Sequence, residues 1–469
     1  MTVTIYNSLT QKKEELVGQD GKTIKMYSCG VTVYDKCHIG HARSLYIFDV
    51  IRRYLQHRGY QVKFIRNITD VDDKIINKAK ELNKRFEDVV EENIALYQKD
   101  IKSLGVNFAD EEPRATAYIP KMVEAIKELI RKEYAYESDG DVYFSVRSFK
   151  DYGQLSGQSV EKMLEAVRID KAEKKRDPLD FALWKKSKEG EPSWDSPWGQ
   201  GRPGWHIECS VMNKEILGDQ IDIHAGGRDL IFPHHENEIA QSEALTGKKP
   251  FARYWIHHGL LTINGQKMAK SLGNFITVED ALKKYTANQL KMLFLSSHYA
   301  SPVDFSDEKM ADMKKSYERI SIFMSKLGDL TEDCYAVILK AKKDFKQSMD
   351  DDFNTPAALA ILFDLIHECN RIMANAPSVK PDFCERSRYL KDKLEAEEFL
   401  KQEVPQIFGL NFIEGSSEQL SQEIQALLNE RIQARQNKNF KRSDEIRDEL
   451  KMKGIIVEDG KGAQTWRRA

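Results

Sequence analysis

The segment 38–41, which has the sequence His-Ile-Gly-His, contains residues that could bind the phosphates of a nucleotide. It lies between a predicted strand and a predicted helix, where free backbone N–H groups and the helix dipole favour an anion. The imidazoles of His38 and His41 can face the same phosphates, and Gly40 lets a nucleotide ring approach the backbone closely. Two histidines that only form hydrogen bonds within the loop are the alternative interpretation.

A second candidate phosphate site is the lysine pair Lys267 and Lys270, which lies between Gly265 and Gly273. In a loop bounded by glycines, the two ammonium groups can move onto a departing pyrophosphate and stabilise the negative charge that develops in the transition state. The alternative is a pair of solvated side chains, since 31% of the residues in this chain are charged.

Residues far apart in the sequence form a possible metal site, which consists of Cys29, Cys209, His234 and Glu238. The last two are four positions apart, so they project from one face of a predicted helix. Two thiolates, an imidazole and a carboxylate suit zinc, although carboxylates are less usual in closed structural sites. Buried thiols beside a surface His–Glu pair are the alternative. The competing ligands are His206, His224 and His235.

The C-terminal residues favour contact with nucleic acid. Between Arg431 and Ala469 there are 11 Lys or Arg residues against six Asp or Glu, although the formal charge of the whole chain is only −2. Trp466 precedes Arg467 and Arg468, a combination that suits base stacking and phosphate contacts. A solvated charged helix and a tryptophan packed in the last strand would explain the same residues.

The composition, with 41% hydrophobic and 31% charged residues, is typical of globular proteins and excludes disordered and fibrous classes. The length of 469 residues suggests roughly three domains. No apolar run approaches the roughly 18 residues of a membrane helix, and Lys12 to Glu15 precede any signal-peptide core, so we expect a cytoplasmic protein. Six scattered cysteines do not suggest a disulfide framework.

Two kinds of periodicity predict the elements that position these residues. A strand–helix–strand pattern, typical of a parallel sheet, covers 23–30, 44–55 and 61–65. After a region rich in charge, Trp, Pro and Gly, the pattern resumes over 221–224, 233–245 and 253–261. Beyond Asp307 a 3.6-residue period predicts helices over 310–330, 333–349, 356–373 and 420–453.

In their order along the chain, the two phosphate-binding segments resemble the two signatures of class I aminoacyl-tRNA synthetases. Longer strings resemble one family of that class, the cysteinyl-tRNA synthetases, along nearly the whole chain. These strings are MYSCGVTVY at 26–34, RPGWHIECS at 202–210, HAGGRDL at 224–230 and PHHENE at 233–238. One departure is Ala269, where the second signature usually has serine. It removes a hydroxyl and leaves both lysines.

The resemblance implies an α/β fold with a Rossmann-like parallel-sheet catalytic domain, an insertion, a helical bundle and a small C-terminal anticodon-binding module. We expect six segments. They are the first half of the catalytic domain at 1–119, a connective insertion at 120–200, the second half at 201–255, a stem-contact region with the Lys267–Ser271 loop at 256–306, the bundle at 307–410 and the anticodon-binding module at 411–469.

The resemblance also implies an enzyme that uses ATP to attach L-cysteine to its tRNA through cysteinyl adenylate. It implies that Cys29, Cys209, His234 and Glu238 bind one zinc ion per chain. The residues implied to act on ATP, which is accompanied by Mg²⁺, are His38, Gly40, His41, Lys267 and Lys270. We expect tRNA, L-cysteine and ATP as partners, no membrane contact, and a monomer.

A metal site answers a physical requirement of such an enzyme. Serine differs from cysteine by one atom, and a discrimination of about 10⁴ needs roughly 5.5 kcal/mol between competing transition states. Zinc binds a thiolate far better than a neutral hydroxyl. Trp205, which is close to Cys209 in the sequence, is a candidate wall of the amino-acid pocket, and a tryptophan of the core is the alternative.

Two other functions remain compatible with the motifs. A ligase that activates cysteine in the same way but attaches it to an amino sugar would lack an anticodon-binding end, whereas residues 420–469 are present here. A tRNA-binding zinc protein without catalytic activity should tolerate substitutions in the nucleotide signatures. Here both signatures are intact except at Ala269. These observations favour the tRNA ligase.

Overall fold

The computed structural model describes residues 2–159, 161, 163, 175–269, 272–375, 386–412, 422–437, 439–453, 455–459 and 464–468. The chain forms two compact units, Met1–Leu410 and Asn411–Ala469. Within the part of the chain that is described, no helix combines the length and the apolar composition that crossing a bilayer requires.

A four-stranded, fully parallel sheet forms the centre of the larger unit, with the strand order β10-β9-β3-β4. Its strands are β3 (Thr23–Thr32), β4 (Gln61–Thr69), β9 (Ile221–Gly227) and β10 (Ala252–His258). The chain leaves β3 through helix α1 (Ile39–His57) towards β4, whereas β9 and β10 lie on the other side of β3. Ligands of open α/β sheets bind at such a switch point, outside the carboxyl ends of the strands. The predicted Rossmann-like architecture is confirmed.

A bulge interrupts β3 where Cys29 is located, because the pairing with β4 shifts register between Ser28 and Val31. The next residue, Gly30, donates its backbone N–H to Asn67 Oδ1 at 2.9 Å. A Cβ atom on Gly30 would lie 1.6 Å from the carbonyl oxygen of Asn67. The bulge changes the direction of a side chain at a strand end, as bulges near functional sites commonly do.

We therefore expect Gly30→Ala to destabilise the protein by about 3 kcal/mol, since the Cβ can only be accommodated by moving β3 away from β4. Thermal unfolding of the two proteins measures the change. Gly328→Ala is the matched control, because nothing lies within 4 Å of the Cβ position at Gly328. Equal melting temperatures for Gly30→Ala and the control would contradict the close contact.

Residues of the predicted insertion (120–200), together with Gly201–Pro203 just beyond its predicted end, form an antiparallel sheet with the order β5-β6-β7-β8. Its strands are β5 (Ala135–Ser138), β6 (Asp141–Phe144), β7 (Phe181–Lys186) and β8 (Gly201–Pro203), and helix α4 (Ile119–Arg131) precedes them. The chain returns to the parallel sheet through α6 (Trp205–Leu217) and, after β9, through α7 (Glu236–Thr246). The buried Glu236 carboxylate accepts hydrogen bonds from the backbone N–H groups of Gly153, Leu155 and Ser156, which joins the insertion to α7.

After β10 the chain forms a small sheet with the order β12-β11-β13. Its strands are β11 (Leu261–Ile263), β12 (Gln266–Lys267) and β13 (Val303–Phe305), and helices α8 (Val278–Lys284) and α9 (Ala287–Leu295) lie between the last two. Asn264 and Gly265 connect β11 to β12 with positive φ angles of 49° and 76°. These angles are typical of a two-residue Asn-Gly hairpin turn, and the hairpin places Lys267 opposite Thr262.

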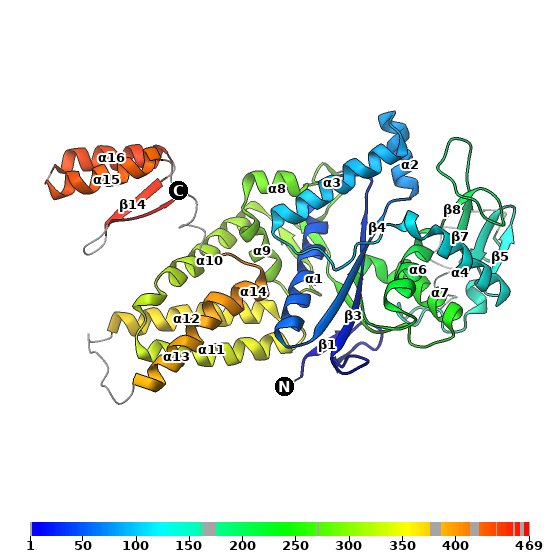
Figure 1. Cartoon of the computed structure of the whole chain (residues 1–469), viewed down its shortest axis with the longest axis horizontal. Coiled ribbons are helices and arrows are strands. Elements are labelled where there is room, and N and C mark those ends of the chain that lie inside the picture. The colour runs from blue at the N-terminus through cyan, green and yellow to red at the C-terminus, as the bar shows by residue number, and fades with distance from the viewer. Residues whose placement is uncertain are drawn as a thin grey trace. The chain divides into compact units, whose positions relative to one another are not determined.

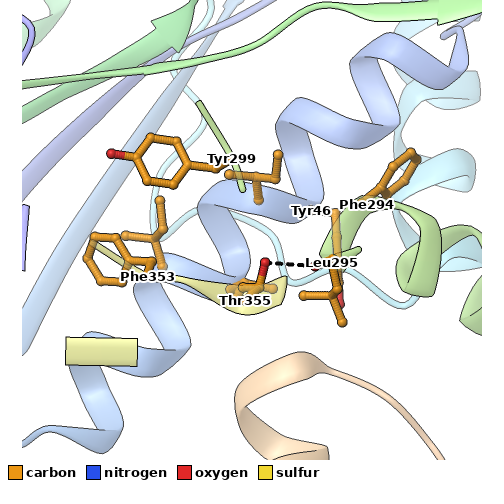
Figure 2. A pocket seen from close by; sticks show the side chains of 9 residues that line it. Tyr46, Phe294, Leu295, Tyr299, Phe353 and Thr355 are labelled. Atoms are coloured by element: carbon orange, nitrogen blue, oxygen red, sulfur yellow. Dashed lines mark hydrogen bonds between the residues drawn. The ribbon is translucent and has the colours of Figure 1, made fainter. Parts of the chain in front are cut away.

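Helices form the remainder of this unit, as the periodicity beyond Asp307 predicts. They are α10 (Asp307–Ser325), α11 (Glu332–Asp350), α12 (Thr355–Asn375), α13 (Arg386–Glu398) and α14 (Val404–Phe408). The parallel strands lie between these helices and the insertion sheet (Figure 1). Where α12 begins, Phe353 and Thr355 join Tyr46 of α1 and Phe294 of α9 around a small apolar pocket (Figure 2). The helical region therefore packs directly on the helix that follows β3.

Two short strands and two helices from the N-terminal part of the chain also belong to the larger unit. They are β1 (Thr4–Asn7), β2 (Lys12–Glu15), α2 (Asp73–Leu82) and α3 (Phe86–Leu104).

The described residues of the smaller unit form two helices and one β-hairpin. These are α15 (Gln422–Gln436), α16 (Phe440–Met452), β14 (Ile455–Asp459) and β15 (Gln464–Arg468). Leu428, Ile446, Leu450 and Ile455 are buried between them. The side chain of Asn439 accepts a hydrogen bond from Arg442 N and caps α16, so the predicted helical segment 420–453 is two helices. Trp466 lies in the last strand, opposite Val457.

Candidate metal and nucleotide site

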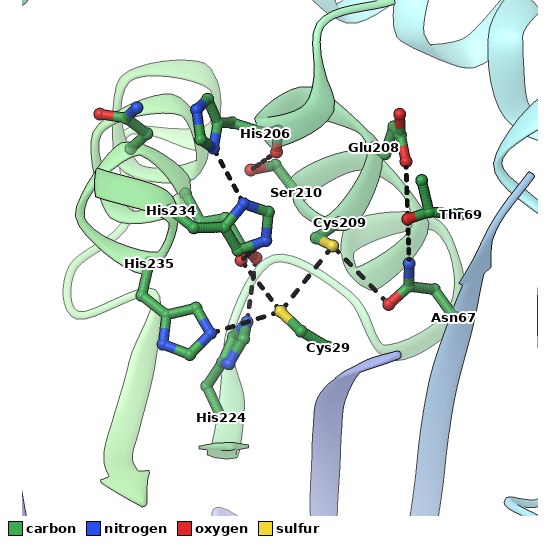
Figure 3. Close-up of polar contacts among 12 residues, drawn as sticks. Cys29, Asn67, Thr69, His206, Glu208, Cys209, Ser210, His224, His234 and His235 are labelled. Atoms are coloured by element: carbon green, nitrogen blue, oxygen red, sulfur yellow. Dashed lines mark hydrogen bonds and ion pairs between the residues drawn. The ribbon is translucent and has the colours of Figure 1, made fainter. Parts of the chain in front are cut away.

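The four residues predicted as metal ligands lie together at the carboxyl edge of the parallel sheet. Cys29 lies in β3 and Cys209 in α6 (Figure 3). His234 lies in the turn before α7, and Glu238 lies in the first turn of α7. One ligand atom from each residue lies within 4.8 Å of the others. All but Cys29, which is half-buried, are buried.

The sulfur–sulfur and sulfur–oxygen distances within this cluster are close to those of a tetrahedral zinc site, whereas the His234–Glu238 distance is shorter and is that of an ion pair. Zinc–ligand distances of about 2.3 Å for sulfur and 2.0–2.1 Å for nitrogen and oxygen place two sulfurs about 3.8 Å apart, sulfur and oxygen about 3.6 Å apart, and nitrogen and oxygen about 3.4 Å apart. The Cys29 and Cys209 sulfurs are 3.9 Å apart, Cys29 Sγ is 3.4 Å from Glu238 Oε1, and His234 Nε2 is 3.0 Å from the same oxygen. The donor set and the spacing of its sulfurs therefore fit zinc.

Two of the competing histidines orient candidate ligands. His206 Nδ1 is 2.9 Å from His234 Nδ1, which leaves His234 Nε2 directed at the cluster. His224 Nε2 is 2.9 Å from Glu238 Oε2, which leaves Oε1 for the cluster. Outer hydrogen bonds of this kind fix ring and carboxylate orientation at metal sites.

The third competing histidine, His235, is part of a second geometrically possible set with Cys29, His224 and Glu238. Its Nε2 lies 3.3 Å from Cys29 Sγ, and its Nδ1 lies 2.8 Å from His257 Nε2. This set has one sulfur where the first has two. Because zinc favours thiolates in mixed sites, the donor chemistry favours the set with Cys209.

The electrostatics of the cluster prepare it for a cation. A hydrogen bond from Cys29 lowers the pKa of Cys209 to about 6, whereas burial raises the pKa of Cys29 well above its usual value. Burial would raise the pKa of Glu238, but the neighbouring His224 and His234 hold it at about 2. Burial would lower the pKa of His234, but the Glu238 charge and Cys209 raise it to about 10. A metal ion would replace the His234 proton between two anionic groups.

The indole of Trp205 stacks on the imidazole of His234, with ring centroids 4.0 Å apart and an interplanar angle of 28°. Trp205 is 37% exposed, so it is not a core residue. It therefore covers one side of the cluster. At another ligand of the cluster, Cys209 Sγ is 3.7 Å from Asn67 Oδ1, and Asn67 donates to Thr69 Oγ1 at 3.2 Å (Figure 3). Asn67 is not among the site residues predicted from the sequence, and its place near the end of β4 is the signal that could have indicated it.

His38 and His41 begin α1 and form a reciprocal capping box. His41 N donates to His38 Nδ1 at 3.2 Å, His38 N donates to His41 Nδ1 at 3.5 Å, and the rings stack with centroids 3.7 Å apart. The alternative interpretation, hydrogen bonds within the loop, is thus correct for these two residues, and phosphate binding stays a prediction. Because both Nδ1 atoms accept, each Nε2 bears the hydrogen and can donate to a phosphate. Burial and, to a smaller extent, the neighbouring His38 lower the pKa of His41 well below its usual value, so the His41 imidazole is neutral at pH 7.

The second signature lies beside the first. A Cβ on Gly40 would be 3.5 Å from Met268 Cε, and the ring of Phe275 packs edge-on against His38. The Asn274 amide binds the backbone of Lys267 and Ala269. Lys267 is exposed, whereas Lys270 and Ser271 lie outside the described residues.

Comparison with known proteins agrees with this geometry. Residues 15–315 match the family model described as tRNA synthetases class I (C) catalytic domain. A cysteine–tRNA ligase from Persephonella marina is 49% identical over the whole of both chains, and one from Aquifex aeolicus is 47% identical over 100% of this chain and 99% of its own. The chain belongs to the cysteine–tRNA ligase family. It is therefore a class I aminoacyl-tRNA synthetase.

Further family models match two later segments of this ligase. Residues 344–412 match a DALR domain, and residues 417–467 match the cysteinyl-tRNA ligase anticodon binding domain. Among solved structures, Mycobacterium tuberculosis methionyl-tRNA synthetase in complex with methionyl-adenylate has a TM-score of 0.60 at 16% identity and covers 83% of this chain and 92% of its own. That similarity concerns the fold.

Proposed function

We propose that this ligase activates L-cysteine with ATP to form cysteinyl adenylate and transfers the cysteinyl group to its tRNA. The observation that carries the proposal is the buried cluster of two thiols, one imidazole and one carboxylate at the sheet edge where the two signatures meet. Relatives that are 47–49% identical over the full chain are named cysteine–tRNA ligases, which supports the same substrates.

We propose that Cys29, Cys209, His234 and Glu238 hold one zinc ion, which when bound supplies selectivity for a thiolate over a hydroxyl. The protein groups orient this site: His206 fixes the His234 ring, and His224 fixes the Glu238 carboxylate. Trp205 excludes water from one side of the amino-acid pocket. Editing is unnecessary where the recognition step itself provides the discrimination.

In the proposed activation step, the cysteine carboxylate attacks the α-phosphorus of ATP and pyrophosphate leaves. Gly40 leaves room for the nucleotide, and the Nε2–H groups of His38 and His41 donate to its phosphates. Lys267 and Lys270 bring positive charge to the departing pyrophosphate, which Mg²⁺ accompanies. These residues position the nucleotide and neutralise the charge on its phosphates, so no covalent enzyme intermediate is required.

A ribose hydroxyl at the tRNA 3′ end, the 2′ hydroxyl by resemblance to class I enzymes, would then take the acyl group. We propose that the insertion and the region after Ser271 guide the acceptor end, and that 411–469 contacts the anticodon arm, to which the excess of basic residues over 431–469 is suited. The six-segment division, a monomeric state and a cytoplasmic location remain predictions of the sequence.

A charging assay tests the proposal. Purified protein with ATP, radiolabelled cysteine and a bulk tRNA preparation should form acid-precipitable cysteinyl-tRNA, and serine should not replace cysteine. Cysteine-dependent pyrophosphate exchange without tRNA charging would favour the ligase that acts on an amino sugar. Binding of tRNA and zinc without any exchange would favour the non-catalytic protein.

A further inference from the structure

A buried arginine links the two signature segments. Arg43 follows His41 by two positions on α1, and its side chain is completely buried. None of the ion pairs between described residues includes it. A buried cation needs compensation, which here comes from backbone carbonyl groups.

Four carbonyl oxygens accept hydrogen bonds from the Arg43 guanidinium. Nη1 donates to Gly259 O at 2.6 Å and Leu260 O at 2.9 Å, and Nη2 donates to Tyr299 O at 3.3 Å and Ser301 O at 2.5 Å. These acceptors belong to two segments, one directly before β11 and the other directly before β13. The planar guanidinium has a fixed donor geometry, so it sets the position of both segments relative to α1.

The two segments are also in close contact with one another. Gly259 N donates to Tyr299 O at 2.8 Å, and a Cβ on Gly259 would lie 2.3 Å from the Ser301 carbonyl group. From Leu260 the chain continues directly into β11, which pairs with β12 so that Thr262 lies opposite Lys267. A displacement of the segments bound to Arg43 therefore moves the strand that contains Lys267.

We propose that Arg43 is a positioning residue that holds the strand of Lys267 in register with His38 and His41 for the activation step. The inference rests on the proposed function, because it concerns pyrophosphate departure. Arg43 is two residues from His41 on one helix, and two of its four acceptors, Gly259 and Leu260, lie three and two positions before Thr262, the β11 residue that pairs with Lys267. A misplacement of about 1 Å at a catalytic group can lower a rate about 100-fold.

Cysteine-dependent pyrophosphate exchange tests this role in Arg43→Met, which removes all donors at similar size. We expect kcat to fall about 30-fold while the KM for cysteine stays within about threefold, since Arg43 does not contact the metal cluster. Arg43→Lys, which keeps the charge and fewer donors, should recover part of the loss. Arg53→Met is the matched control on the same helix. Among the described residues, Arg53 binds Asp49 and Gln406 O, which lie outside both signature segments, so its substitution should leave kcat unchanged.

A double-mutant cycle with Lys267→Ala separates positioning from general stability. If Arg43 acts by placing Lys267, Arg43→Met should cost less than about fivefold further in the Lys267→Ala background. The full 30-fold loss in that background, or an unchanged kcat in Arg43→Met, would overturn the inference. If Arg43→Met does not fold, Arg43→Lys takes its place in the same cycle. Absence of exchange in the unmodified protein would instead overturn the proposed function.

Discussion

Cys209→Ser is expected to lose bound zinc and, with it, the preference for cysteine over serine. The substitution keeps the size of the side chain but replaces a thiolate, whose pKa is already lowered to about 6 by the hydrogen bond from Cys29, with a hydroxyl that stays protonated. We expect the zinc content to fall from about one to below about 0.2 per chain, and kcat/KM for cysteine in pyrophosphate exchange to fall about 1,000-fold.

Cys334→Ser is the matched control for this prediction. Cys334 is as buried as Cys209, but it packs between α11 and α12, where its sulfur is 3.8 Å from the Cys369 carbonyl oxygen. Its zinc content and selectivity should equal those of the unmodified protein. Stoichiometric zinc with intact selectivity in Cys209→Ser would remove Cys209 from the site and favour the set that contains His224 and His235.

Lys270→Ala is expected to slow adenylate formation about 100-fold without changing zinc content. The removed ammonium group is the one that the second signature assigns to the charge on departing pyrophosphate, and loss of one such electrostatic group typically costs 10²–10³ in rate. Single-turnover formation of cysteinyl adenylate measures the step directly. Because the proposed role of Lys270 concerns pyrophosphate and not the amino acid, the KM for cysteine should remain within about threefold.

Lys283→Ala provides the comparison. Lys283 is an exposed lysine on the nearby helix α8, and it forms an ion pair with Asp280. Its removal should leave the rate unchanged, as is usual for exposed ion pairs. An unchanged rate in Lys270→Ala would show that the lysine loop does not act on pyrophosphate.

Features that depend on local sequence could be predicted. The alternation of strand and helix, the helices beyond Asp307 and the turn at Gly265 follow from periodicity and from residues with special backbone preferences. A helix N-terminus at His38 could also be predicted, because anion-binding motifs and capping motifs use the same free backbone N–H groups. In that case both interpretations of one motif describe the same residues.

The parts of the site in which residues distant in the sequence come together in the fold could not be derived from the spacing of residues along the chain. Cys29 and Cys209 are 180 positions apart, and only the resemblance to a family favoured their pairing over His224 or His235. Which of these residues join Cys29 as ligands depends on the bulge in β3 and on which nitrogen of each histidine already has a hydrogen-bond partner. Neither feature can be predicted from a short stretch of sequence. The burial of Arg43 could not be predicted for the same reason. In the sequence, an arginine that is buried among backbone carbonyl groups cannot be distinguished from one on the surface.

X-ray absorption at the zinc edge tests the central claim most directly. For the purified protein, we predict two sulfur scatterers at about 2.3 Å and two nitrogen or oxygen scatterers at about 2.0–2.1 Å. Addition of cysteine should add one more sulfur at about 2.3 Å, whereas serine should leave the spectrum unchanged. A spectrum with no sulfur, or one that cysteine does not alter, would contradict selection of the substrate through its thiolate.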